Sequence, residues 1–159
     1  MAQAKEYAKT QGSRAVLTGT TELRRSIVDI VSHAERSLSI LTPNLEPEIY
    51  EHVDFLDALK RFVLARTFAR VRVLITQPER TMRSGNQFVQ MGQRLNTYIQ
   101  FRNLAPEHRP VRNAWCIADT DALVYRVDHA SGEGVVDSCA PEIAKRYLGE
   151  FEALWQAAR

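Results

Sequence analysis

The sequence lacks an apolar run long enough to cross a membrane. A membrane-spanning helix needs about 20 consecutive, mainly apolar residues, and no stretch of this 159-residue chain approaches that length. Residues 1–13 also lack the apolar centre of a secretory signal peptide. We therefore predict no membrane span, with residues 1–14 as a polar tail and residues 15–159 as one domain.

Cysteine and histidine are both scarce. Cys116 and Cys139 are the only cysteines, and two distant thiols in a chain with an adequate core do not form a disulfide framework. This favours a cytoplasmic location. No two of the four histidines stand at a metal-ligand spacing such as i, i+4, so the sequence predicts neither a zinc site nor another cofactor.

Basic residues are concentrated in residues 60–112. Eleven of them stand there against only Glu79 and Glu107, a balance of +9 in a chain whose net charge is +2. The composition is rich in arginine, whose planar guanidinium suits phosphate and carboxylate. The segment is either an anion-binding or nucleic-acid-facing surface, or a stretch whose charges folding scatters over several faces. Because charge asymmetry alone is a weak signal, we favour scattering.

Helices and strands alternate in the first half of the chain. Apolar residues at helical spacing predict a helix capped by Thr20 or Thr21, a second capped by Asp54, and a third opened by a capping box at residues 84–87. Residues 38–41 and the alternating residues 71–75 predict buried strands. This order favours an α/β fold with a mixed β-sheet flanked by helices.

The second half is richer in strands. Residues 98–101, 113–118, 123–127 and 135–136 predict strands, and the short connection at residues 119–121 predicts a hairpin. Hairpins add antiparallel strands to a sheet that starts from parallel ones. Pro141 suits the first turn of a closing helix.

Residues 112–119, Arg-Asn-Ala-Trp-Cys-Ile-Ala-Asp, fit the frame of a His-x-Lys-x-x-x-x-Asp motif. Together with the opening Gly-Thr-Thr-Glu-Leu-Arg helix and the Val-Arg-Val-Leu-Ile strand, this stretch resembles one half of a phospholipase D-like fold. The resemblance covers about residues 17–155. It looks closest to bacterial phospholipase D-like domains of unknown function, which occur alone or joined to acetyltransferases.

The resemblance implies both an assembly and a lost activity. In the catalytic families, two such halves face each other, one histidine attacks phosphorus, the other protonates the leaving oxygen, and the lysines hold the phosphate. A single half therefore implies a homodimer. Of the motif, only Asp119 is present, because Arg112 takes the nucleophile position and Ala114 the lysine position. Arginine stays protonated and cannot attack phosphorus. Residues 125–128 also lack the Gly-Ser-x-Asn-like segment of these families.

Four residues remain candidates for anion binding. Arg112 can grip a phosphate or carboxylate while Asp119 orients it, and the other two candidates are His108 and Arg126. The plain alternatives are an ordinary structural pair of Arg112 with Asp119 and a solvated loop histidine at position 108.

Three functions follow from the sequence. The first is a non-catalytic module that binds a phosphate-bearing ligand or a protein partner. The second is a phosphodiesterase or nuclease whose catalytic residues are not those of the motif. The third is a nucleic-acid-binding domain that uses residues 60–112.

Overall fold

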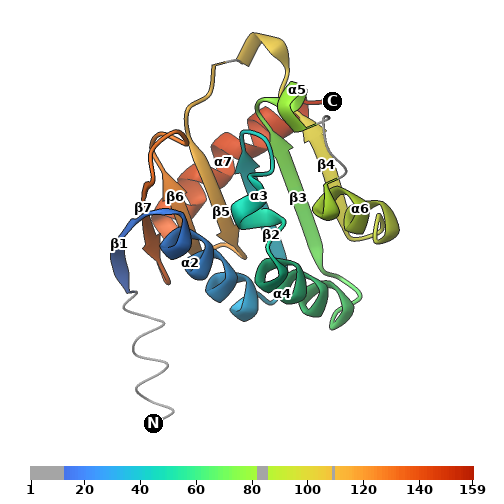
Figure 1. Ribbon diagram of the computed structural model, residues 1–159, viewed down its shortest axis with the longest axis horizontal. Coiled ribbons are helices and arrows are strands. Elements are labelled where there is room, and N and C mark those ends of the chain that lie inside the picture. The colour runs from blue at the N-terminus through green and yellow to red at the C-terminus, as the bar shows by residue number, and fades with distance from the viewer. Residues whose placement is uncertain (1–12, 82–85, 109) are drawn as a thin grey trace.

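A seven-stranded mixed sheet forms the centre of the computed structural model (Figure 1), which describes residues 13–81, 86–108 and 110–159. The strand order is β1-β7-β6-β5-β2-β3-β4. The strands are β1 (Arg14–Thr18), β2 (Ser37–Thr42), β3 (Arg70–Ile75), β4 (Ile99–Asn103), β5 (Ala114–Ala118), β6 (Ala122–Arg126) and β7 (Glu133–Asp137). The predicted mixed sheet is therefore confirmed.

The directions of the strands determine where a ligand site can form. Strands β2, β3 and β4 are parallel, whereas β5 runs antiparallel to β2 and continues into the antiparallel set β6, β7 and β1. The carboxyl ends of β2 and β3 and the amino end of β5 therefore meet at one edge of the sheet. In open α/β sheets, ligands bind at this kind of edge.

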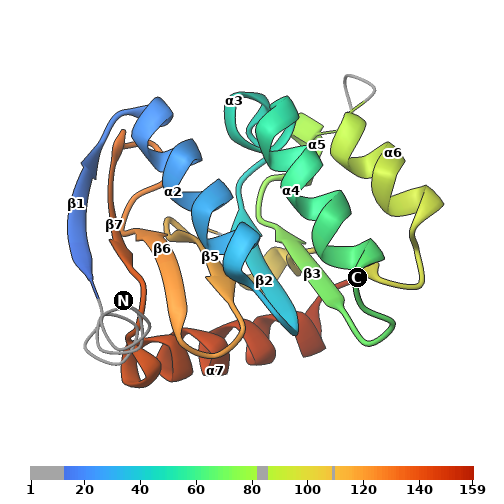
Figure 2. The ribbon, with the colours of Figure 1, turned by 90° about the horizontal axis from the view of Figure 1, so that it is seen from below.

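Helices cover both faces of the sheet. They are α2 (Thr20–His33), α3 (Pro47–Tyr50), α4 (Val53–Leu64), α5 (Pro78–Thr81), α6 (Gln87–Arg94) and α7 (Pro141–Ala157), with a 3-10 turn η1 (Pro106–His108). Figure 2 shows α2, α4 and α6 on one face and α7 on the other, which gives three layers. Among the described residues, no helix combines the length and the hydrophobicity that crossing a bilayer requires.

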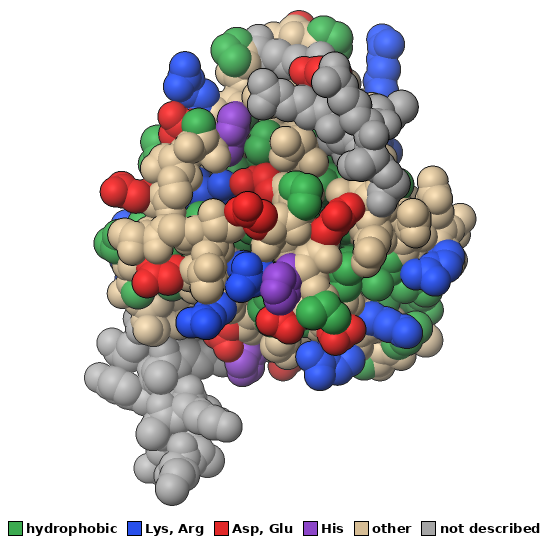
Figure 3. Space-filling model, in the orientation of Figure 1, with side chains coloured by type: hydrophobic (Ala, Val, Ile, Leu, Met, Phe, Trp, Pro, Cys, Tyr) green, Lys and Arg blue, Asp and Glu red, His purple; other side chains and the backbone are tan. Residues whose placement is uncertain are grey.

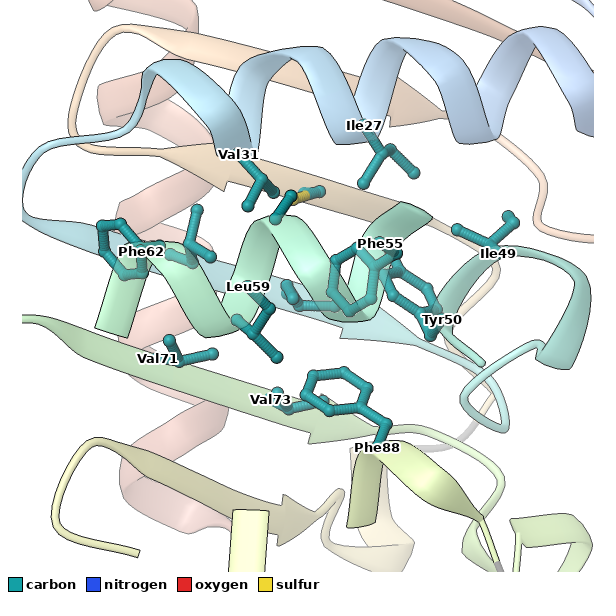
Figure 4. Close-up of a cluster of buried hydrophobic side chains, with 14 of the residues drawn as sticks. Ile27, Val31, Ile49, Tyr50, Phe55, Leu59, Phe62, Val71, Val73 and Phe88 are labelled. Carbon is teal, nitrogen blue, oxygen red and sulfur yellow. The ribbon is translucent and has the colours of Figure 1, made fainter. Parts of the chain in front are cut away.

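The larger core lies between the sheet and α2, α4 and α6. Figure 4 shows Val31, Phe55, Leu59, Val73 and Phe88 pointing toward one another from four different elements, and all five are buried. A second cluster lies under α7, where Leu41, Leu74, Trp115, Ile117, Leu123, Phe151 and Trp155 are buried. Because both faces of β5 are covered, all five of its residues are buried, which explains its continuous apolar sequence.

Two predicted helix caps are wrong. Helix α2 begins at Thr20 after Gly19, whose φ of 92° suits glycine, and Thr20 and Thr21 are both helical residues. Helix α4 is capped by His52, because its Nδ1 accepts the backbone N–H of Asp54 at 3.1 Å. Asp54 therefore donates the capped N–H, and its carboxylate is not the cap. Sequence patterns did not separate a cap from its immediate neighbours.

The start of α6 and the amino-terminal segment differ in part from what the sequence predicted. Asn86 caps α6 by accepting from the backbone nitrogens of Phe88 and Val89, while Ser84 of the predicted capping box lies outside the described residues. Residues 1–12 of the predicted tail also lie outside them. Strand β1, which the sequence analysis did not predict, pairs antiparallel with β7.

Candidate functional site

Asp119, which the sequence analysis aligned with the acid of the motif, holds two chain segments together. It follows β5 with a φ of 58°, and its carboxylate accepts backbone N–H groups of Glu35, Arg36 and Ser37 at 2.7–3.2 Å. Its own backbone nitrogen donates to the Ser37 carbonyl at 2.7 Å. Asp119 therefore fixes the turn before β2 to the β5–β6 hairpin.

Arg112 and Asp119 do not form the predicted pair. Arg112 precedes the amino end of β5, whereas Asp119 follows its carboxyl end. The whole strand therefore separates them, and Asp128 supplies the carboxylate that Arg112 contacts. The prediction that Asp119 orients Arg112 is wrong.

Arg126 forms a buried ion pair with Glu46. It is only 5% exposed, and its two terminal nitrogens donate to the two carboxylate oxygens of Glu46 at 2.9 and 2.5 Å. One of them also donates to the His129 carbonyl at 3.2 Å. Burial lowers the pKa of Arg126, but the hydrogen bonds and charge of Glu46 outweigh it and raise the pKa. We assign Arg126 to the support of the loops rather than to ligand contact.

A pocket of about 450 Å³ lies at the edge where β3 ends and β5 begins. We call it the carboxyl-edge pocket, and its lining residues are Thr76, Gln77, Glu79, Pro110, Val111, Arg112, Asp128, His129 and Ala130. Backbone hydrogen bonds from Thr76 to Thr42, from Gln77 to Pro43 and from His129 to Arg112 hold its walls. Its volume falls within the range of small-molecule sites.

Buried polar atoms without partners accumulate at this edge. In the described part of the chain, Oδ1 of Asn44, Oγ1 of Thr76 and Oε1 of Gln77 are buried and have no hydrogen-bond partner. Asn44 follows β2 closely, and Thr76 and Gln77 follow β3 directly. Buried polar groups are nearly always hydrogen-bonded in folded proteins. Three such atoms therefore lie at this one edge of the sheet, and two of them belong to residues that line the carboxyl-edge pocket.

Arg112 keeps most of its hydrogen-bonding capacity. Its side chain is 77% exposed, and its contact with Asp128 is long, at 3.4 Å between Nη1 and Oδ2. The pKa of Asp128 is lowered, first by the hydrogen bond from the Ala130 backbone nitrogen and further by the charge of Arg112. Exposed ion pairs of this kind stabilise a fold little. A ligand anion can therefore replace Asp128 at the guanidinium.

The histidine at the pocket is His129, which the sequence analysis did not select. His129 is half-buried and lines the pocket two residues beyond the exposed Val127. His108 lies in the exposed turn η1, outside the residues that line the pocket. The backbone bond between His129 and Arg112 extends the β5–β6 ladder. Continuing the β5–β6 register, in which Ala114 pairs with Arg126, places Asp128 opposite Arg112 and His129 one residue further along the chain.

The basic residues of segment 60–112 disperse over the molecule. Lys60 and Arg61 are exposed on α4, Arg94 is exposed on α6, and Arg112 lies at the pocket. On the face that carries α2, α4 and α6, Figure 3 shows acidic and basic side chains interspersed, without a continuous basic patch. Three other arginines, Arg70, Arg72 and Arg102, belong to β3 and β4. Within the described ranges, no group of three or more His, Cys, Asp or Glu residues could hold a metal ion.

The sequence matches one family over nearly its whole length. The family model is described as Domain of unknown function (DUF7931) and matches residues 19–159. The chain belongs to this family. No curated protein matches the DUF7931 chain in sequence.

Solved structures identify the fold of this DUF7931 domain. Nuc from Salmonella typhimurium, a phospholipase D family member, is similar with a TM-score of 0.65 at 19% identity, covering 93% of this chain and 97% of Nuc. NucT from Helicobacter pylori is similar with a TM-score of 0.62 at 12% identity, covering 92% of this chain and 98% of NucT. The DUF7931 domain therefore has a phospholipase D-like fold, as its resemblance predicted.

A third neighbour is larger. TrmBL2, described as an archaeal chromatin protein with a novel mode of DNA binding, has a TM-score of 0.66 at 12% identity. The similarity covers 92% of this chain but only 52% of TrmBL2. At these identities, the three structures establish the fold alone. What the domain binds or catalyses has to be argued from its own residues.

Proposed function

We propose that this DUF7931 domain is a non-catalytic phospholipase D-like module that binds a phosphate-bearing ligand in the carboxyl-edge pocket. The observation that carries the proposal is Arg112, whose guanidinium is 77% exposed at the pocket and has only a long contact with Asp128 among the described residues. Guanidinium groups bind phosphate through paired, charge-assisted hydrogen bonds. Thr76, whose buried hydroxyl has no partner, also lines this pocket.

The other pocket residues suit the remainder of such a ligand. Glu79 and Asp128 offer carboxylates. These groups accept hydrogen bonds from hydroxyl or amino groups. We therefore expect a ligand that carries hydroxyl or amino groups beside its phosphate, because a bare phosphate would meet two carboxylates and one arginine.

Two positions argue against catalysis by the histidine motif. Arg112 stands where the catalytic families place the nucleophilic histidine, and Ala114, which is 1% exposed, stands where they place lysine. A guanidinium stays protonated and a buried methyl group holds no phosphate. What remains from the motif is Asp119, whose carboxylate is engaged with backbone donors.

Binding is tested by calorimetric titration of the full chain with adenosine 5′-monophosphate and with inorganic phosphate. Arg112→Ala should abolish the heat of binding, whereas Asp128→Asn should tighten binding because it frees the guanidinium. His108→Ala is the matched control and should bind as wild type does. Equal binding by wild type and Arg112→Ala would contradict the proposal.

A second candidate is a phosphodiesterase that uses His129. One observation favours it: His129 lies in the same pocket as Arg112, so an imidazole and a phosphate-binding group are close together. Turnover of bis-para-nitrophenyl phosphate, lost in His129→Ala and kept in His108→Ala, would establish this activity. No turnover by wild type supports the binding module.

We further propose that the module is a cytoplasmic homodimer. The resemblance to phospholipase D-like families, in which two such halves face each other, supports this proposal, and the chain covers 97% of Nuc, a member of that family. Val127 is 72% exposed beside the pocket, where a partner could cover it. Sedimentation equilibrium should give twice the 18.1 kDa chain mass, and Val127→Glu should reduce it to one chain. A monomeric wild type would exclude the dimer.

Nucleic acid is a third candidate ligand. The likeness to a chromatin protein described as binding DNA supports it. The dispersal of the basic residues of segment 60–112 restricts this candidate, because only those that share a face can act together.

A further inference from the structure

Four arginines and an exposed phenylalanine lie on or beside the face of β3 and β4 that α7 contacts. We call this surface the arginine face, and its residues are Arg36, Phe68, Arg70, Arg72 and Arg102. Arg36, Phe68 and Arg70 lie at the amino ends of β2 and β3, at the opposite end of these strands from the carboxyl-edge pocket, whereas Arg102 lies near the carboxyl end of β4. In Figure 1, α7 runs obliquely behind the sheet toward the carboxyl end of β3.

Strand register places these arginines side by side. The backbone nitrogen of Arg70 donates to the carbonyl of Arg36 at 3.1 Å. Arg72 pairs with Gln100, and Arg102 pairs with Leu74, which packs under α7. Because side chains alternate along a strand, Arg70, Arg72 and Leu74 share the α7 face, opposite Val71 and Val73 of the larger core.

Aromatic rings hold two of the guanidinium groups. The guanidinium carbon of Arg102 lies 4.5 Å from the centre of the Trp155 ring, and that of Arg72 lies 5.4 Å from it. Arg102 also donates to the Trp155 carbonyl at 2.9 Å. Stacked guanidinium groups are held in place while their outward N–H groups stay available.

The charge of the arginine face is only partly balanced. Arg72 donates to Glu152 at 2.7 Å. Arg36 and Arg70 are exposed and form no ion pair with any described residue. Glu35, the exposed acid beside Arg36, also forms none within the described chain. The arginine face therefore keeps a net positive charge.

Phe68 lies between two hollows on this surface. Its side chain is 63% exposed, which is unusual for a phenylalanine. One hollow, of about 500 Å³, is lined by Arg36, Ser37, Phe68 and Arg70. The other, of about 320 Å³, is lined by Thr67, Phe68, Ala69, Arg70, Val71, Arg72, Thr97, Tyr98 and Gln100. Both hollows thus combine an arginine with the same exposed ring.

We infer that the arginine face binds single-stranded nucleic acid. Unpaired bases stack on exposed aromatic rings while arginines follow the phosphates, and Phe68 with Arg36 and Arg70 provides this combination. A duplex hides its base faces and would use the charges alone. The inference narrows the nucleic-acid candidate above to one surface and rests on that candidate, but it is independent of the ligand proposed for the carboxyl-edge pocket.

The test is fluorescence anisotropy of the full chain with labelled 12-nucleotide single strands of DNA and RNA and with a DNA duplex of equal length. With three arginines contacting phosphates, the logarithm of affinity for a single strand should fall against the logarithm of salt with a slope of about −2. The double variant Arg36→Ala/Arg70→Ala should flatten this slope to about −0.7. Phe68→Ala should weaken single-strand binding about 5-fold or more without changing the slope.

A matched control separates this surface from diffuse charge. The double variant Arg25→Ala/Lys60→Ala removes two exposed basic side chains from the opposite face and should bind as wild type does. Glu152→Gln, which frees Arg72, should tighten binding and steepen the slope by about 0.7.

The possible outcomes separate the two claims. Single-strand binding that is indifferent to Phe68 and to Arg36 with Arg70 would overturn the arginine face while leaving nucleic-acid binding in place. No binding to any strand at low salt would overturn both. Binding of a poly-glutamate peptide is the comparison for the ligand class. If Phe68→Ala and Arg36→Ala/Arg70→Ala weaken peptide binding as much as they weaken single-strand binding, the assignment to nucleic acid is overturned and an acidic protein partner is indicated.

Discussion

The carboxylate of Asp119 accepts the backbone N–H of Arg36 at 2.7 Å and so joins the β5–β6 hairpin to the start of β2. The same carboxylate accepts the N–H groups of Glu35 and Ser37. Asp119 thus has a structural task that needs no neighbouring histidine or lysine. This structural task is reason enough for an aspartate at position 119, whatever residues occupy positions 112 and 114.

Replacing Asp119 should destabilise the fold. Asp119→Ala leaves three backbone donors without their acceptor, and we expect a loss of about 2–3 kcal/mol in the free energy of unfolding. Asp119→Asn keeps one acceptor oxygen and tolerates the φ of 58°, so it should lose less. Urea unfolding followed by circular dichroism measures both values. An unchanged midpoint for Asp119→Ala would contradict the structural role.

The ion pair of Glu46 with Arg126 gives a second prediction. Glu46→Ala leaves a buried guanidinium without its counter-ion, which should reduce the unfolding free energy by about 3–5 kcal/mol. Glu48→Ala removes an exposed carboxylate from the same turn and should change it by less than about 0.5 kcal/mol. Thermal unfolding of the two variants compares them directly. Similar melting temperatures would show that the pair contributes little.

Two helical glycines should respond oppositely to alanine. A Cβ at Gly92 would lie 2.2 Å from Cε2 of Phe101, so Gly92→Ala should destabilise by about 1–3 kcal/mol through overpacking. A Cβ at Gly149 would meet nothing within 4 Å, so Gly149→Ala should stabilise α7 by about 0.5–1 kcal/mol. The same unfolding titration measures both, and equal signs would contradict the packing described around Phe101.

Cys116 should be inert in the folded protein. Burial raises the pKa of its thiol to about 12, and only the thiolate reacts rapidly with iodoacetamide. At pH 8, mass spectrometry should therefore find Cys116 unmodified until denaturant is added. Alkylation of native Cys116 within minutes would show that the β5 core opens readily.

The same thiol contributes to stability at alkaline pH. Its pKa is about 12 when folded and near 9.0 when unfolded, so the contribution is complete below pH 9.0 and is lost as pH rises toward 12. Cys116→Ala should therefore show a weaker fall in unfolding free energy across this interval. The buried hydroxyl of Tyr50, whose pKa burial also raises, should still contribute in that variant.

The strands could be predicted from sequence because their burial is a local property. Residues 71–75 alternate visibly, and the fully buried β5 reads as an apolar run. The caps of α2 and α4 were missed because Gly19 and His52 act through backbone conformation and a ring nitrogen, which composition does not mark. Strand β1 was missed because only one of its five residues is buried.

The sequence predicted only some of the residues at the carboxyl-edge pocket. Arg112 was selected because the motif frame marks it. Its true neighbours, Thr76 and His129, come from the ends of β3 and β6, so only the sheet order brings them together. Arg126 was misjudged because its partner Glu46 is 80 residues away in sequence.

The central claim is that Arg112 at the carboxyl-edge pocket binds a phosphate group. It is tested most directly by ¹⁵N–¹H correlation spectra of the full chain during titration with adenosine 5′-monophosphate. We predict shifts that saturate and concentrate on the amides of Thr76, Gln77 and His129 in wild type, and that are lost in Arg112→Ala. Shifts of equal size in Arg112→Ala, or shifts confined to residues away from this edge, would contradict the claim.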